Sequence, residues 1–140
     1  MRHIVIDTNV FVSALRSRQG ASHRLLLLIG RGAFEVDISV PLIVEYEDAA
    51  KRMAREVGFS HADIDDILDY LCAVAHGRRI HFLWRPFLKD PQDDHVLELA
   101  VESESDCIVT HNVRDFVGVE QFGVRVVTPQ EFLRQIGEGR

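Results

Sequence analysis

The chain has 140 residues, and its 16 basic and 22 acidic residues give a net charge of −6. This length predicts one domain, residues 1–140, and a composition with 46% hydrophobic and 27% charged residues excludes disordered and fibrous proteins. No apolar run approaches the ~20 residues of a membrane span, the start has no signal-peptide pattern, and two cysteines are too few for a disulfide framework. We therefore expect a cytoplasmic protein with no membrane partner. The acidic balance argues against a basic nucleic-acid coat protein, but not against an enzyme that holds nucleic acid through metal ions.

Strand and helix signals alternate along the chain. Short apolar or alternating runs predict strands at residues 3–6, 34–39, 79–83, 106–110 and 124–127. Helical spacing and capping residues predict helices over residues 10–15, 21–30, 39–57, 60–77 and 96–101, and a last helix from 128. Alternation of this kind predicts an α/β fold, a three-layer α/β/α sandwich with a mostly parallel central sheet.

Functional groups of parallel sheets collect at the carboxyl ends of the strands, and polar residues come directly after two of the expected strands. Asp7 ends the first strand, where a buried carboxylate is costly unless it is paired or bound to a cation. The alternative is that Asp7 only caps the next helix, although Thr8 or Asn9 is also able to do so. Thr110 and Asn112 come after the fourth expected strand, where an Asx-turn is the structural alternative.

Further carboxylates stand at the starts of two expected helices. Glu45 lies four residues after Pro41, in the first turn of its helix, and taken alone it reads as a solvated group beside the helix dipole. Capping needs one aspartate, yet three precede the 96–101 helix: Asp90, Asp93 and Asp94. Asp93 shares a helix face with the apolar residues of that segment, so we favour Asp93 over Asp94 as the inward group.

Three or four carboxylates from distant segments would thus converge at one end of the sheet. Their mutual repulsion requires a counter-charge, and hard oxygen ligands select Mg²⁺ or Mn²⁺ over zinc. Asn112 is able to contribute a carbonyl oxygen, and Asp115 reaches such a cation directly or through water. A site of this kind activates water and stabilises charge on a phosphate.

The motifs that carry these residues resemble those of the PIN-domain family. The opening Ile-Val-Ile-Asp-Thr-Asn-Val-Phe-Val-Ser-Ala-Leu places Asp7 at the first family acid, and Pro-Leu-Ile-Val-Glu-Tyr places Glu45 at the second. In Asp-Pro-Gln-Asp-Asp-His-Val-Leu-Glu-Leu-Ala the alanine register places Asp93 at the third, and Asp-Cys-Ile-Val-Thr-His-Asn-Val-Arg-Asp-Phe resembles the closing motif. The resemblance covers about residues 2 to 130.

The resemblance implies a metal-dependent endoribonuclease, similar to stand-alone VapC-like toxins of toxin–antitoxin pairs. Asp7, Glu45 and Asp93 would hold Mg²⁺ or Mn²⁺, and water would attack an RNA phosphodiester in line, leaving 5′-phosphate and 3′-hydroxyl ends. It also implies a homodimer and a small antitoxin partner. One residue departs from the family: Asn112 stands where a carboxylate is common, and Asp115 is expected to supply the charge, with Thr110 orienting Asp7.

Several features carry weaker expectations. The basic residues expected near RNA are Arg16, Arg18, Arg24, Lys51, Arg52, Arg55 and Arg114. His111 lies beside the expected site, His95 comes directly after Asp94, and the apolar run 25–29 is expected to meet another chain in part. Phe82 and Trp84 are expected to pack in the core.

Four other functions compete with the endoribonuclease. One of them, a receiver domain, needs a phosphorylated aspartate after a middle strand, and residues 39–41 offer none. A catalytically decayed scaffold that binds RNA or protein rests on Asn112 alone. An aspartyl phosphatase needs an aspartate where Asn9 stands, and a structure-specific DNA nuclease usually has a longer chain with an additional arch.

Overall fold

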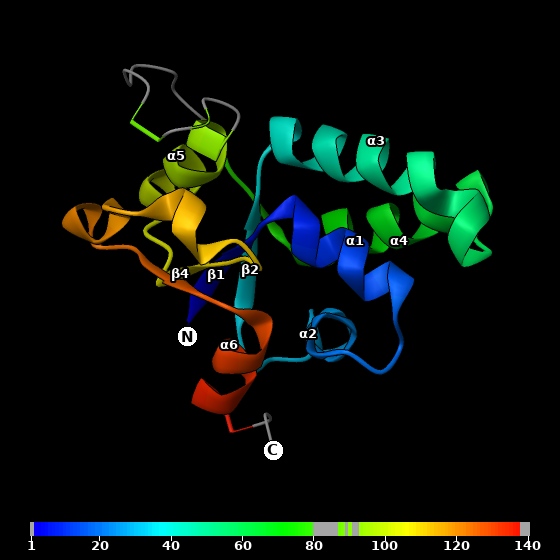
Figure 1. Cartoon of the computed structure of the whole chain (residues 1–140), viewed down its shortest axis with the longest axis horizontal. Coiled ribbons are helices and arrows are strands. Elements are labelled where there is room, and N and C mark those ends of the chain that lie inside the picture. Colours follow the sequence, from blue (N-terminus) through cyan, green and yellow to red (C-terminus); the bar gives the residue numbers. More distant parts are fainter. Residues whose placement is uncertain (1, 80–86, 89, 91–92, 138–140) are drawn as a thin grey trace.

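The computed structural model describes residues 2–79, 87–88, 90 and 93–137, and within them five parallel strands form one sheet (Figure 1). The strand order is β3-β2-β1-β4-β5. The strands are β1 (His3–Ile6), β2 (Glu35–Ile38), β3 (His76–Gly77), β4 (Cys107–Val109) and β5 (Arg125–Val127). The helices are α1 (Thr8–Arg16), α2 (Ala21–Leu28), α3 (Val40–Val57), α4 (His61–Val74), α5 (Asp94–Glu102) and α6 (Pro129–Gln135), with short 3₁₀ helices η2 (Val113–Phe116) and η3 (Val119–Phe122).

The strand order reverses direction between β1 and β4, and this reversal sorts the helices into two layers. The chain passes from β1 to β2 to β3 through α1 to α4, then returns through α5 to β4 on the other side of β1. In Figure 1 the strands lie between α5 and the 3₁₀ helices on one side and α1, α2 and α4 on the other. This confirms the predicted α/β sandwich with a parallel sheet, and ligands of such sheets bind at the point of reversal.

Local sequence signals set most of the helix boundaries as predicted. The Ser39 hydroxyl accepts the backbone N–H of Leu42 at the start of α3, and Gly58 ends that helix in the left-handed conformation, with φ of 78°. Capping boxes open α4 through Ser60 with Asp63, and α6 through Thr128 with Glu131. These caps need no tertiary contact, which is why the sequence alone located them.

The core fills both faces of the short sheet. Ile4, Val5 and the three residues of β4 have no exposed surface. Phe11 of α1 stacks on Tyr46 of α3 with ring centroids 4.6 Å apart, and the buried Tyr46 hydroxyl donates to the Ile6 carbonyl. Tyr46 therefore fixes α3 against the carboxyl end of β1, one residue before Asp7.

The edge of the sheet differs from the prediction. We expected a helix until Gly77 and a strand over residues 79–83, but α4 ends at Val74 and His76–Gly77 pair with β2 as β3. Arg79 lies outside the strand, and residues 80–83, like Phe82 and Trp84 of the expected core, lie outside the described residues. Two residues are too few to show an alternating or apolar pattern, so only pairing with Asp37 and Ile38 identifies this strand.

Candidate active site

Asp7 stands at the carboxyl end of β1, beside the point where the strand order reverses. Its side chain accepts the backbone N–H of Thr8 at 2.9 Å and the Thr110 hydroxyl at 2.8 Å. Asp7 is the N-cap of α1, so the capping alternative describes its backbone correctly. Burial nevertheless raises the pKa of this carboxyl above its usual value, against the lowering effect of these two hydrogen bonds. A cap alone does not require a carboxylate that is only 6% exposed.

Glu45 projects from α3 towards the same end of the sheet. Helix α3 begins at Val40, so Glu45 lies in the second turn rather than the first turn that we expected, and the dipole explanation loses its basis. Both carboxylate oxygens have partners: the Thr8 hydroxyl donates to Oε1, and His95 Nε2 lies 2.7 Å from Oε2. The hydrogen bond with His95 is the main reason that the pKa of Glu45 is lowered.

Asp93 immediately precedes α5 and faces other carboxylates. It occupies the N-cap position but makes no capping hydrogen bond through its side chain. Burial, together with the negative charges of Asp7, Asp90, Asp115 and Glu45, raises the pKa of Asp93 to about 7. Asp93 therefore lies near acids from three other segments of the chain, which are the end of β1, α3 and η2, as well as near Asp90.

Asp94, the neighbour of Asp93, has a different environment. Its Oδ1 accepts the backbone N–H groups of Phe87 at 3.2 Å and Leu88 at 2.9 Å, while its Oδ2 is buried without a partner among the described residues. One turn later Glu98 is also buried, and burial together with the Asp94 charge raises the Glu98 pKa. Asp94 thus holds the chain that enters α5, and Asp93 is the member of the pair that faces the other acids.

The segment after β4 joins the site through a chain of polar contacts. Asn9 Nδ2 donates to Thr110 Oγ1 at 3.2 Å and to Asp7 Oδ2 at 3.3 Å, and Asn9 Oδ1 accepts the His111 backbone N–H. The Asn112 backbone N–H donates to Thr110 Oγ1 at 3.1 Å. The Asn112 side chain is exposed, and Asp115, also exposed, is the carboxylate of this segment that acts on Asp93.

The structure therefore brings most of the predicted residues together at the reversal point. The charges of Asp7, Glu45 and Asp115 act on Asp93, and that of Glu45 acts on Asp7. Thr8 donates a hydrogen bond to Glu45, and Asn9 and Thr110 donate to Asp7. His95 contacts the site through Glu45, although the sequence pattern gave little indication of this. Its only sequence signal is its place two residues after Asp93, since a lone histidine without a ligand spacing predicts little.

The donor chemistry of this cluster suits a hard divalent cation, although the arrangement as it stands does not enclose one. Among the described residues, no three histidine, cysteine or acidic side chains are placed to hold a metal ion together. The donors are nevertheless carboxylate oxygens, and all the charges that raise the Asp93 pKa are negative. Oxygen donors with uncompensated negative charge are the ligands that Mg²⁺ and Mn²⁺ bind in proteins.

The comparison with known families agrees with this arrangement. A family model described as the PIN domain matches residues 3–114, which span β1 to the start of η2. The chain belongs to the PIN-domain family. PIN domains are generally nucleases, and three of the four clustered acids lie within the matched segment, with Asp115 one residue beyond it. No curated protein matches the chain.

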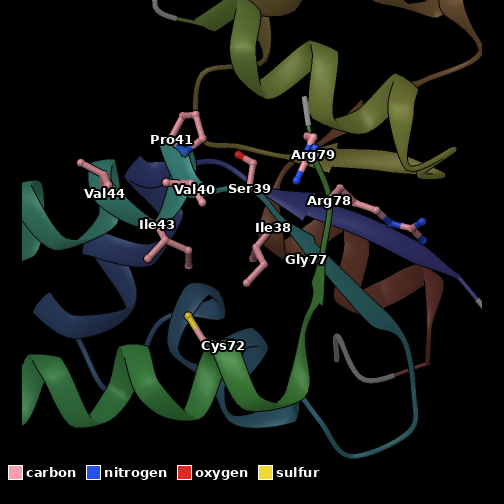
Figure 2. Close-up of a pocket in the computed structure, with 10 residues that line it drawn as sticks. All are labelled: Ile38, Ser39, Val40, Pro41, Ile43, Val44, Cys72, Gly77, Arg78 and Arg79. Carbon is pink, nitrogen blue, oxygen red and sulfur yellow. The ribbon is translucent and has the colours of Figure 1, made fainter. Parts of the chain in front are cut away.

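Two hollows in the surface are separate from the acidic cluster. One, of about 550 Å³, lies between the start of α3 and β3 and is mainly apolar, with Val40, Val44 and Cys72 on its wall (Figure 2). The other, of about 650 Å³, includes Leu27 and Tyr70 from α2 and α4. None of the four clustered acids lines either hollow, so neither hollow contains the candidate active site.

Proposed function

We propose that this PIN-domain protein is a Mg²⁺- or Mn²⁺-dependent endoribonuclease and the toxin of a toxin–antitoxin pair. One observation carries the nuclease proposal: Thr8 and His95 tie Glu45 of α3 to Asp7 at the end of β1 and to the start of α5. Asp93 at that start is close enough to Asp7, Glu45 and Asp115 for their charges to raise its pKa. Like charges so arranged oppose folding unless a cation binds between them. A catalytically decayed scaffold is not favoured, because in this proposal Asp115 supplies the negative charge that Asn112 lacks.

In this proposal the residues of the cluster have separate tasks. Asp7, Glu45, Asp93 and Asp115 hold the cation, and the Asn112 amide oxygen assists; Asp94 is the alternative third acid, which its bonds to the 87–88 backbone disfavour. Thr110 and Asn9 orient Asp7 by donating to its Oδ2. A divalent cation bound there would lower the pKa of a water molecule and stabilise the charge that develops on a phosphate.

The binding of RNA in this proposal needs basic side chains that are not already paired with acids of the protein. Lys51 is bound to Glu47 at 2.9 Å and Asp65 at 2.7 Å, and Arg52 to Asp48 at 2.8 Å. These two cations are therefore already paired within α3 and α4. We place more weight on the exposed Arg114, which lies in η2 next to Asp115.

The proposed protein partners, an antitoxin and a second copy of the chain, need an apolar contact surface. Residues 25–29 provide part of such a surface. Leu25 and Ile29 are buried, but Leu27 is 56% exposed on the wall of the 650 Å³ hollow. An antitoxin segment that covers Leu27 accounts for this exposure, and a homodimer is the other partner that the family resemblance implies. Within the described residues, no helix combines the length and apolar character that a membrane-spanning segment requires.

The decisive experiment compares RNA cleavage by the wild type and by Asp7→Asn. Purified, antitoxin-free protein is incubated with structured and unstructured RNAs in Mn²⁺, Mg²⁺ or EDTA, and the product ends are mapped. We expect cleavage that needs the cation, leaves 5′-phosphate ends and falls at least about 100-fold in Asp7→Asn. Loss of a partner outside the ligand set already costs about 10- to 100-fold in many metal sites.

Asp69→Asn is the matched control, because Asp69 is an exposed acid on α4 outside the cluster. It should cut RNA at the wild-type rate. Cleavage that persists in EDTA, or that survives Asp7→Asn, would refute the proposed site. Cleavage of DNA in preference to RNA would replace the endoribonuclease with a DNA nuclease.

A further inference from the structure

The Glu45 carboxylate is held at both of its oxygens by residues from two other helices. Thr8 of α1 donates its hydroxyl to Oε1, and His95 of α5 lies 2.7 Å from Oε2 through Nε2. Glu45 has 39% of its side chain exposed, whereas His95 has 15%. The more exposed carboxylate is thus held by the more buried ring.

A glutamate at the surface of a helix has three rotatable side-chain bonds. Fixing such a side chain costs conformational entropy, unless neighbouring groups hold it in advance. Cation binding is sensitive to this, because ligands that are already oriented need no further ordering when the ion arrives. Two hydrogen bonds, one to each oxygen, provide that orientation for Glu45.

His95 also connects two of the acids through the backbone. It lies two residues after Asp93 in the first turn of α5, and α5 packs against α3. The Nε2 contact therefore sets the position of the α5 start, with Asp93, relative to Glu45. The other ring nitrogen, Nδ1, is buried and has no hydrogen-bond partner, so Glu45 is the polar group among the described residues that orients this ring.

We propose that His95 is a positioning residue, which fixes the Glu45 carboxylate through Nε2 so that Glu45 and Asp93 bind a divalent cation together. This inference rests on the proposed function, because it assigns a role within the same cation site. It goes beyond the acidic residues of that site. A histidine outside the ligand set then determines the affinity for the cation.

The test is the affinity for Mn²⁺, measured by titration calorimetry on folded protein, alongside kcat and KM for RNA cleavage. His95→Leu removes the donor at similar size, and His95→Gln keeps an N–H group near the position of Nε2. We expect the Mn²⁺ dissociation constant to rise at least about 10-fold in His95→Leu and to stay within about 3-fold of wild type in His95→Gln. At saturating Mn²⁺, kcat of His95→Leu should recover substantially.

Other outcomes separate the failure of this inference from failure of the proposed function. If the wild type binds Mn²⁺, Asp7→Asn does not, and His95→Leu binds it as well as wild type, the positioning role is wrong and the nuclease proposal stands. A fall in the stability of His95→Leu without a change in Mn²⁺ affinity likewise marks a merely structural residue. If the wild type binds no divalent cation and cuts no RNA, both proposals fail.

A measurement on the wild type covers the case in which His95→Leu does not fold. The ring nitrogen NMR signals of His95, recorded with and without Mg²⁺, report which nitrogen donates a hydrogen bond. We expect Nε2 to remain the hydrogen-bonded donor when Mg²⁺ is present. Loss of that bond on adding Mg²⁺ would overturn the positioning role.

Discussion

At the scale of single residues, the acids of the cluster differ in how each is stabilised. Asp7 and Glu45 accept hydrogen bonds from Thr110 and Thr8, which partly offset their burial. Asp93 makes no capping hydrogen bond, and its pKa of about 7 reflects burial and neighbouring negative charge. Asp93 is therefore the acid whose ionisation most opposes the folded, cation-free state.

This predicts a pH dependence of stability that Asp93→Asn removes. The folded-state pKa lies above the usual value of 3.8, so the carboxyl stays protonated in the folded chain while it ionises in the unfolded chain. The wild type should lose stability relative to Asp93→Asn as pH rises from about 4 to about 7, by on the order of 1–2 kcal/mol after solvent screening. Urea unfolding in EDTA at about pH 4.5 and about pH 8 measures this difference. A constant difference between the two proteins at both pH values would contradict the assigned burial.

At the scale of elements, helix α5 carries an unusual amount of buried polar surface. Asp94 and Glu98 are 8% and 7% exposed, and within the described part of the chain each leaves one carboxylate oxygen without a hydrogen bond. Asp94 is compensated in part by the backbone N–H groups of Phe87 and Leu88 at its other oxygen. The buried Glu98 oxygen therefore costs free energy in the helix that presents Asp93.

Glu98→Gln should therefore stabilise the protein at neutral pH. The raised pKa of Glu98 means that its ionised form is disfavoured in the folded chain, so the benefit is present well above the usual pKa and disappears as pH falls towards about 4. We expect a gain of about 1 kcal/mol in the free energy of unfolding, measured in urea at about pH 8. Glu102→Gln, at an exposed position of the same helix, is the control and should change little.

At the scale of the whole molecule, the site exists only because four segments meet where the strand order reverses. The ends of β1 and β4 are adjacent in the sheet, Tyr46 of α3 donates a hydrogen bond to the end of β1, and α5 packs against both strands. A cation that binds there binds the folded chain alone, since the unfolded chain does not bring these acids together. Cation binding and global stability are consequently linked.

Mn²⁺ should raise the unfolding temperature of the wild type. At a free concentration about 100 times the dissociation constant, the stabilisation is about 2.7 kcal/mol. Asp93→Asn should show at most a small part of this shift, although it is the more stable protein in EDTA. Differential scanning calorimetry of both proteins, with and without Mn²⁺, tests the prediction, and equal shifts would place the cation elsewhere.

The sequence by itself determined the elements and most of the acids. Caps such as Ser39 and Ser60 act within one turn of their helices, so their effect is local and readable from the chain. Buried strands such as His3–Ile6 are largely apolar, and a parallel sheet gathers the residues after its strands at one edge. The order and spacing of residues thus pointed to Asp7 and Asp93, whereas Glu45 and Asp115 were expected in the site because their motifs resemble those of the PIN-domain family.

Only the tertiary structure shows which groups hold the acids of the cluster. Asp93 and Asp94 both stand at the start of α5, and the backbone N–H groups at 87–88, which bind Asp94, come from a preceding segment. The bond of His95 to Glu45 spans 50 residues. The two-residue strand β3 is likewise defined by its pairing with β2. Such contacts depend on the path of the whole chain, so no local pattern contains them.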